Sequence, residues 1–154
     1  MRKVTSIAVL LFAAIMVMAA FVPGSGARAA ETVAVVERVA GQVSIDRNGE
    51  RSTATEGQAI EARDTVITAS EAAVGLRFTD GAEIALGPET TFRIQEYRYD
   101  NARDEGAFKG RLSRGTLSAR SGRIAKRGRD RMLVETPSTI LGVRGTRFMV
   151  KVDD

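Results

Sequence analysis

Apolar and polar residues alternate with a period of two along most of the chain after residue 30, a pattern typical of β-strands with one buried face. Turn-forming dipeptides such as Asn48-Gly49 and Asp80-Gly81 separate the alternating runs. The pattern predicts an all-β fold: a single twisted domain, either solenoid-like or sandwich-like. The apolar positions that define the strands are Val39, Val43, Ile45, Val74, Leu76, Phe78, Ile84, Leu86, Phe92, Ile94, Met132, Val134, Val143, Phe148 and Val150.

The start of the chain has the order of features found in a secretory signal peptide. Arg2 and Lys3 form a short positive segment, and an uncharged apolar run occupies residues 7–22. A Pro-Gly-Ser-Gly breaker and the small residues of Ala27-Arg28-Ala29 follow. The apolar run falls short of the ~20 residues that span a bilayer comfortably, which disfavours a retained anchor. We therefore predict a signal peptide at 1–29, cleaved after Ala29, and a periplasmic domain at 30–154 that meets the membrane only through this leader.

The charge of the predicted mature domain is close to neutral. The whole chain has 23 Lys and Arg against 19 Asp and Glu. Three of the basic residues, Arg2, Lys3 and Arg28, lie in the leader, which has no acidic residue, so the domain retains 20 basic against 19 acidic side chains. We therefore expect no nucleic-acid partner, because a nucleic-acid-binding domain carries a strong positive excess.

Basic residues are concentrated between positions 103 and 131. Two interpretations remain open: a solvated hairpin whose charge keeps a sheet edge from pairing, or a docking patch for an acidic partner or an anionic membrane surface. The residues of this possible binding patch are Arg111, Arg114, Arg120, Arg123, Lys126, Arg127, Arg129 and Arg131.

The residue types that most often carry catalysis or bind metals are missing. The chain contains no His and no Cys, which removes the commonest general base, the thiolate nucleophile and the usual ligands of transition metals. Carboxylates such as Asp80, Glu83 and Glu135 could in principle form a hydrolytic pair, but an Asp in a turn has a backbone role of its own. We expect a non-enzymatic protein with no cofactor and no metal.

An ordered set of motifs runs through the domain. Gly41-Gln42-Val43-Ser44-Ile45 comes first, Asp80-Gly81 stands between two strands, and a Thr-Pro pair precedes the closing Val-Arg-Gly-Thr-Arg-Phe at 143–148. From about residue 39 to 150 the chain resembles the FecR-type periplasmic domain family. The motif residues that carry the resemblance are Gly41, Gly57, Asp80, Gly81, Gly115, Thr136, Pro137, Arg144, Gly145, Thr146 and Phe148.

The resemblance implies a protein-interaction module that takes part in envelope signalling linked to TonB-dependent iron uptake. Its partner would be an outer-membrane receptor or an inner-membrane regulator. Family domains tend to continue for another strand or two, so the chain is either a minimal module or lacks its last strands. The alternative function is a cell-envelope scaffold that binds peptidoglycan or surface polysaccharide.

Several motif residues have a physical role that can be stated without the family. Gly41, Gly57 and Gly115 are expected to take positive φ where a strand begins or kinks. Asp80-Gly81 should close a hairpin, and Pro137 suits a strand end because it lacks an N–H.

Arg144 follows the apolar Val143, precedes Gly145 and lies close to Phe148 in sequence, and we expect it to be buried as a structural latch. Its partner would be a loop carbonyl or an acid such as Glu135 or Asp80, because a buried guanidinium must be paired. On this hypothesis its replacement by Ala destabilises the domain by roughly 2–4 kcal/mol.

Overall fold

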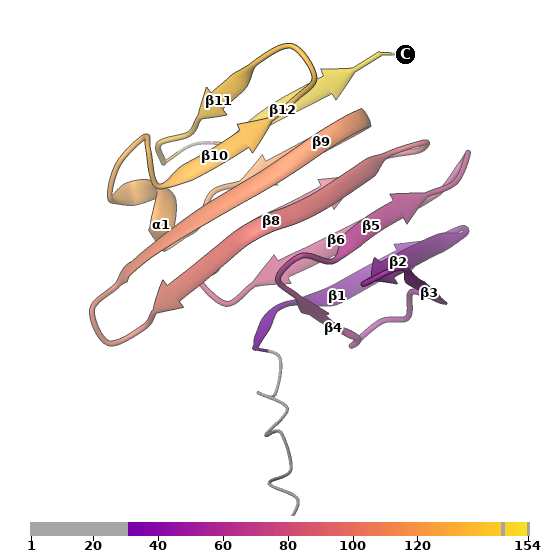
Figure 1. The fold of residues 1–154 in the computed structure, drawn as a ribbon, viewed down its shortest axis with the longest axis horizontal. Helices are drawn as coiled ribbons and strands as arrows, with labels where there is room; N and C mark the ends of the chain where they lie inside the picture. Colours follow the sequence, from indigo (N-terminus) through magenta and orange to yellow (C-terminus); the bar gives the residue numbers. More distant parts are fainter. Residues whose placement is uncertain (1–30, 146, 154) are drawn as a thin grey trace, which may run out of the picture.

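The computed structural model describes residues 31–145 and 147–153, so the predicted leader and Thr146 lie outside it. Within these ranges the chain forms twelve strands and one short helix (Figure 1). The elements are β1 (Thr32–Ala40), β2 (Val43–Arg47), β3 (Glu50–Thr53), β4 (Ala59–Glu61), β5 (Thr65–Thr68), β6 (Ala73–Phe78), β7 (Glu83–Leu86), β8 (Thr91–Asp100), β9 (Glu105–Arg120), α1 (Arg123–Lys126), β10 (Met132–Glu135), β11 (Ile140–Gly142) and β12 (Arg147–Val152).

The strand pairings build two curled faces that share the long strand β9. We call the series β4-β1-β6-β7-β9-β12 sheet A and the series β3-β2-β5-β8-β9-β10-β11 sheet B. Among the described strands every pair is antiparallel except β9 with β10. In the view of Figure 1, β8 and β9 lie in front of the fainter β6. The all-β prediction is confirmed, and the strands form one curled, mostly antiparallel sheet that resembles half of a barrel.

Gly115 lets β9 pass from one sheet to the other. Residues before it pair with β8, and residues after it pair with β7. Its φ is +90°, and a Cβ at this position would lie 2.3 Å from Oγ1 of Thr90. The same Oγ1 accepts a hydrogen bond from the N–H of Thr116 at 3.0 Å. Only glycine fits this bend, because a side chain would be strained in φ and would collide with Thr90.

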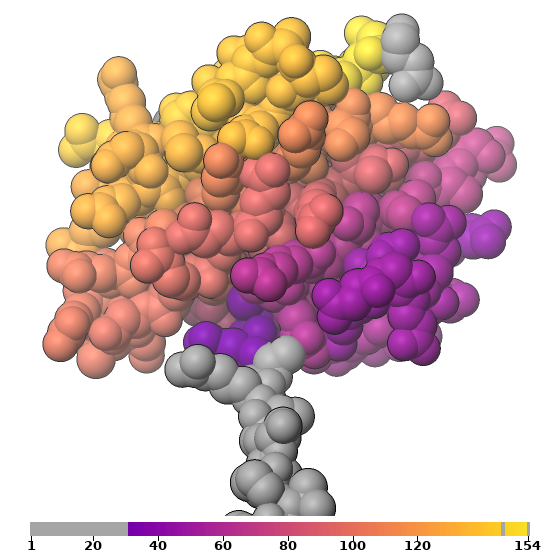
Figure 2. All heavy atoms as spheres, viewed as in Figure 1, coloured from indigo at the N-terminus to yellow at the C-terminus, as the bar shows by residue number. Residues whose placement is uncertain are grey.

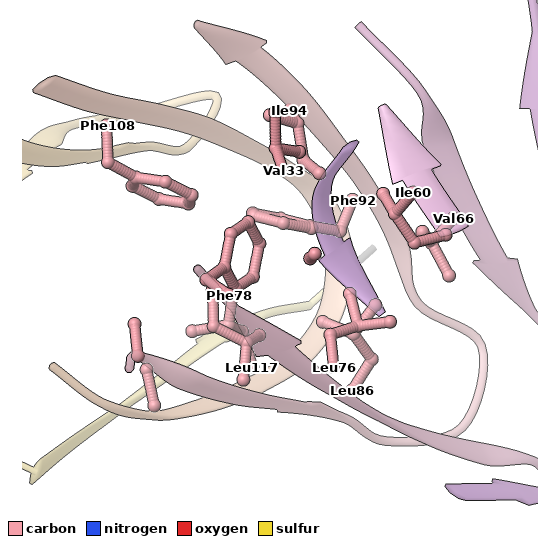
Figure 3. Packing of buried hydrophobic residues seen from close by; sticks show 14 of the residues in the cluster. Val33, Ile60, Val66, Leu76, Phe78, Leu86, Phe92, Ile94, Phe108 and Leu117 are labelled. Atoms are coloured by element: carbon pink, nitrogen blue, oxygen red, sulfur yellow. The ribbon is translucent and has the colours of Figure 1, made fainter. Parts of the chain in front are cut away.

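The core lies between the two sheets and consists of the inward-facing positions of the alternating strands. Phe78 on sheet A meets Phe108 on β9 edge-on, with ring centroids 5.2 Å apart. Figure 3 shows side chains of sheet A, among them Leu76 and Leu86, turned toward Phe92 and Ile94 on sheet B. The period-two alternation therefore predicted the buried face of β6, β7, β8 and β10 correctly.

Asp80 connects the β6–β7 turn to α1. Its side chain is 3% exposed, and its Oδ2 accepts a hydrogen bond from the N–H of Ile124 at 3.2 Å. Its Oδ1 accepts from the N–H of Ala82 at 3.1 Å, and its own N–H donates to the Tyr97 hydroxyl at 2.9 Å. These bonds hold the buried Ile124 against the core.

Candidate functional site

The outer face of sheet A has a shallow trough whose floor is made of small residues. Gly75 on β6, Ala85 on β7 and Ser118 on β9 are consecutive cross-strand partners, so they share one face of the sheet. Two depressions of about 490 and 220 Å³ lie over them and have Gly75, Ala85, Glu37 and Glu83 in common. They therefore form one continuous trough.

An apolar side chain stands at one end of this row. Met149 on β12 lies opposite Ser118 and is 70% exposed. Its neighbours Phe148 and Val150 are turned inward and pack against the core, so the alternation of β12 directs Met149 outward. An exposed Met is an adaptable apolar contact for a partner.

Charged residues form the rim of the trough. Glu83 lies within salt-bridge distance of Arg77, at 3.6 Å, and of Arg120, at 2.5 Å, while Arg77 also bonds to Glu37. Arg147 lies opposite Arg120, which places two like charges side by side, an unfavourable arrangement.

The trough as a whole carries positive charge. Its lining contains four guanidinium groups, those of Arg38, Arg77, Arg120 and Arg147, against the two carboxylates of Glu37 and Glu83. In the part of the chain that the structure describes, no carboxylate lies within 4.0 Å of Arg38 or Arg147. The surface is therefore suited to a ligand that is part apolar and part acidic.

The basic block of residues 103–131 does not form one patch. Arg111 and Arg114 lie on the outer face of sheet B, whereas Arg120 lies on sheet A and bonds to Glu83. The division follows from the crossing of β9 between the sheets at Gly115. The other members lie on or after α1. Arg123 bonds to Tyr99 and Asn101, and Arg127 bonds to Asp104. Arg131 pairs with Asp130, while Lys126 and Arg129 are exposed.

Several motif residues have the local conformations that the sequence predicted. Gly41, Gly57 and Gly115 take φ values of +71°, +82° and +90°, and Asp80 with Gly81 closes the β6–β7 hairpin. Gly145 has a φ of +59°.

The Thr136-Pro137 pair forms a turn directly after β10. The N–H of Thr136 donates to the Thr139 carbonyl at 2.8 Å, and the Thr139 N–H donates to Oγ1 of Thr136 at 3.1 Å. Phe148 packs against the core, and Thr146 lies outside the described residues.

Comparison with protein families gives one match. A family model described as FecR protein covers residues 64–154, which include β5 to β12. The chain belongs to the FecR family. Members of this family are typically associated with the cell envelope and its signalling. Comparisons with curated proteins and with solved structures gave no match.

The expectation that Arg144 of this FecR family member is a buried latch is wrong. Its side chain is exposed between β11 and β12, and both proposed acidic partners are engaged elsewhere. Asp80 is bonded to the β6–β7 turn and α1. Glu135 bonds to Lys109 at 2.7 Å. The Val143 side chain alone turns into the core, so apolar neighbours in sequence did not imply burial of Arg144.

The guanidinium that does hold a buried acid is Arg47, which sequence reasoning did not single out. The hydrogen bonds that Arg47 donates to the Asp64 carboxylate raise the pKa of Arg47, against the opposing effect of its partial burial. The trough was also missed. The sequence feature that could have indicated it is the presence of Gly, Ala and Ser at outward-facing strand positions, where charged residues are commoner.

Among residues 31–145 and 147–153, no cluster of three or more acidic, His or Cys side chains could hold a metal. None of the helices described has the length and apolar character needed to cross a bilayer.

Proposed function

We propose that this protein is a non-enzymatic, periplasmic interaction module that binds another envelope protein through the trough on sheet A. In this proposal the partner is an outer-membrane receptor or an inner-membrane regulator, and the contact serves envelope signalling linked to TonB-dependent iron uptake. The family supplies the signalling context, and the trough is the single observation that carries the binding role.

The chemistry of the trough supports a protein segment as its occupant. Small side chains at Gly75, Ala85 and Ser118 leave room for a chain to lie close to the sheet. The exposed Met149 adds apolar area, and the excess of guanidinium groups favours a partner segment with acidic residues. The mixture of apolar floor and charged rim is typical of protein interfaces.

The absence of His and Cys from the sequence supports a role without catalysis. Nucleophilic or acid–base chemistry would have to rely on carboxylates or hydroxyls. The two buried acids among the described residues, Asp64 and Asp80, are both engaged in hydrogen bonds that stabilise turns and strands. Neither lies in the trough.

The proposal can be tested by crosslinking in intact cells. A photo-crosslinking amino acid is placed at Ser118 in the trough and, as a matched control, at Thr53, an exposed position on β3 of the other sheet. We expect Ser118 to give one dominant crosslinked envelope protein, and the Thr53 control to give none.

A second variant separates trough binding from chance proximity. Ala85→Glu fills the trough and adds negative charge at an exposed position, which repels an acidic partner segment, so it should abolish the Ser118 crosslink without lowering the melting temperature. Crosslinks only to a second copy of the chain or to polysaccharide, or a crosslink that survives Ala85→Glu, would contradict the proposal.

A further inference from the structure

The outer face of sheet B has a second depression, of about 610 Å³, lined entirely by polar and cationic side chains. Its residues are Arg63, Thr65, Thr91, Arg93, Gln95, Arg111 and Ser113. They come from the turn before β5 and from β5, β8 and β9. Figure 2 shows the molecule in the same view as Figure 1, with β8 and β9 toward the viewer.

The backbone gives this depression a defined geometry. Thr65, Arg93 and Arg111 are consecutive cross-strand partners on β5, β8 and β9, so their side chains share one face. Arg63 lies beside them because its N–H donates to the carbonyl of Ile94 at 2.8 Å. Its φ of +78° belongs to the turn that directs the chain into β5.

None of the three guanidinium groups forms a salt bridge with a carboxylate of the described residues. Within the described ranges, no carboxylate lies within 4.0 Å of Arg63, Arg93 or Arg111. Arg93 and Arg111 are directly opposite each other, and like charges in that position destabilise a sheet. An anion bound between them would remove this repulsion and form charge-assisted hydrogen bonds with planar donors.

The nearest acid is already engaged. Glu135 lies opposite Arg111 in the register of β9 and β10, but its carboxylate contacts Nζ of Lys109 at 2.7 Å. The hydrogen bond from Lys109 is the largest influence and lowers the pKa of Glu135 against the opposing effect of desolvation, and smaller contributions from Gln95 and from the charges of Lys109 and Arg111 act in the same direction. Glu135 is therefore anionic and bound to Lys109, and Arg111 remains available to a ligand.

Gln95 supplies a second, independent sign of a ligand. It sits at the irregularity in register between Ile94 and Glu96, and it contributes to lowering the pKa of Glu135. Its Oε1 is buried and has no hydrogen-bond partner among the described residues. A buried acceptor without a partner is unfavourable, and because Gln95 lines the depression, a rotation of its side chain toward a hydroxyl or N–H donor of a ligand would satisfy it.

We propose that this depression binds an anionic saccharide. Arg63, Arg93 and Arg111 would hold its carboxylate or phosphate group, and Oε1 of Gln95 would accept a hydrogen bond from a sugar hydroxyl. The hydroxyls of Thr65, Thr91 and Ser113 can donate to or accept from the other sugar hydroxyls. This proposal is independent of the trough on sheet A.

The position of the depression favours a saccharide over an acidic peptide strand. Strand addition requires the free backbone groups of a sheet edge. Here β5, β8 and β9 are interior strands, flanked by β2 on one side and β10 on the other. Only side chains are offered to the ligand, and most of them are hydroxyl or guanidinium groups that match a charged polyhydroxyl compound.

Calorimetric titration of the purified protein tests the proposal with four probes. Trigalacturonate carries carboxylates, glucose 6-phosphate carries a phosphate, maltotriose is the neutral saccharide, and hexaglutamate is an anion without sugar hydroxyls. We expect trigalacturonate or glucose 6-phosphate to bind, and whichever binds more tightly identifies the anionic group. Maltotriose and hexaglutamate should each bind at least about tenfold more weakly.

Variants assign the binding to this depression. Arg93→Gln with Arg111→Gln should weaken binding of the anionic saccharide by at least about tenfold. Arg129→Gln, which removes an exposed charge in the loop before β10, should change it by less than about twofold. Gln95→Ala should weaken binding of the saccharide while leaving the binding of inorganic phosphate unchanged. Circular dichroism confirms that each variant is folded.

Three results would overturn the proposal. Equal affinity for hexaglutamate and the anionic saccharides would show a non-specific anion surface. Binding that is unchanged in the Arg93→Gln, Arg111→Gln variant would place the ligand elsewhere. Failure of both anionic saccharides to bind the folded protein would show that the depression has no such ligand.

Discussion

The carboxylate of Asp64, immediately before β5, is held by the guanidinium of Arg47 at the end of β2. Nε of Arg47 lies 2.9 Å from Oδ1, and Nη2 lies 2.7 Å from Oδ2. Asp64 is 1% exposed, and its Oδ2 also accepts the N–H of Glu61 at 2.9 Å. This two-point contact joins a strand of sheet B to the turn that leads from β4 into β5.

Loss of this contact should destabilise the fold. Arg47→Ala leaves the buried Asp64 carboxylate without its cation, and we expect a decrease of about 3 kcal/mol in the free energy of unfolding. This value lies at the lower end of the range for breaking a buried ion pair, because Arg47 is partly exposed. Urea denaturation followed by circular dichroism measures it. Adding Asp64→Asn to Arg47→Ala should recover part of the loss. A single variant as stable as the parent would contradict this role.

Two glycine substitutions separate backbone strain from steric collision. Gly57→Ala places a side chain at a φ of +82° with no heavy atom within 4 Å, and should cost about 1–2 kcal/mol. Gly115→Ala adds a collision with Thr90 at a similar φ, and should cost at least about 3 kcal/mol. Thermal melts of the two variants measure the difference. Equal destabilisation would show that the close approach of β9 to Thr90 has no importance.

Arg144→Ala should leave stability nearly unchanged, within about 0.5 kcal/mol, because the side chain is exposed. Chemical denaturation alongside Arg47→Ala gives the comparison, since the two variants lose the same charge. A loss of several kcal/mol on removing Arg144 would restore the latch hypothesis and would require a contact that this structure does not contain.

Tyr97 should make the fold sensitive to alkaline pH. Burial, the largest influence, raises the pKa of its hydroxyl in the folded state above the ordinary value of 10.0. Its stabilising contribution is therefore complete below pH 10 and declines as the pH rises above it, because the unfolded chain then releases a proton that the folded chain retains. The expected slope reaches about 1.4 kcal/mol per pH unit.

Urea titrations between pH 9 and 11.5 measure this slope, and Tyr97→Phe provides the control. The variant should be less stable at neutral pH, because the hydroxyl bonds to Thr79 and Asp80 are lost. Its stability should also fall less steeply above pH 10. Parallel curves for the two proteins would exclude Tyr97 as the group responsible.

The local parts of the fold were predictable because they depend on short-range chemistry. Alternation marked the buried residues of β6, β7 and β8, and Asp80-Gly81 marked the hairpin between two of these strands. Arg144 was predicted wrongly because alternation fails in the loop between β11 and β12, where the side-chain direction is no longer set by a pleat.

The candidate sites were less accessible to sequence reasoning because each is assembled from strands distant in the chain. Gly75 and Ser118 share the floor of the trough through pairings with β7, and Arg93 meets Arg111 only through the register of β8 and β9. Pairing register depends on the whole sheet, and a shift by one residue would turn each of these side chains to the other face.

The sequence by itself determined that this protein is an all-β member of the FecR family with glycines at its turns and without His or Cys. These properties follow from composition, a period of two and the conformations that individual residues allow. Only the tertiary structure decided that β9 crosses between the sheets at Gly115, which divides the basic block and opens two different outer faces. The physical reason is that side chains acquire neighbours through strand pairing, and pairing is a property of the folded sheet as a whole.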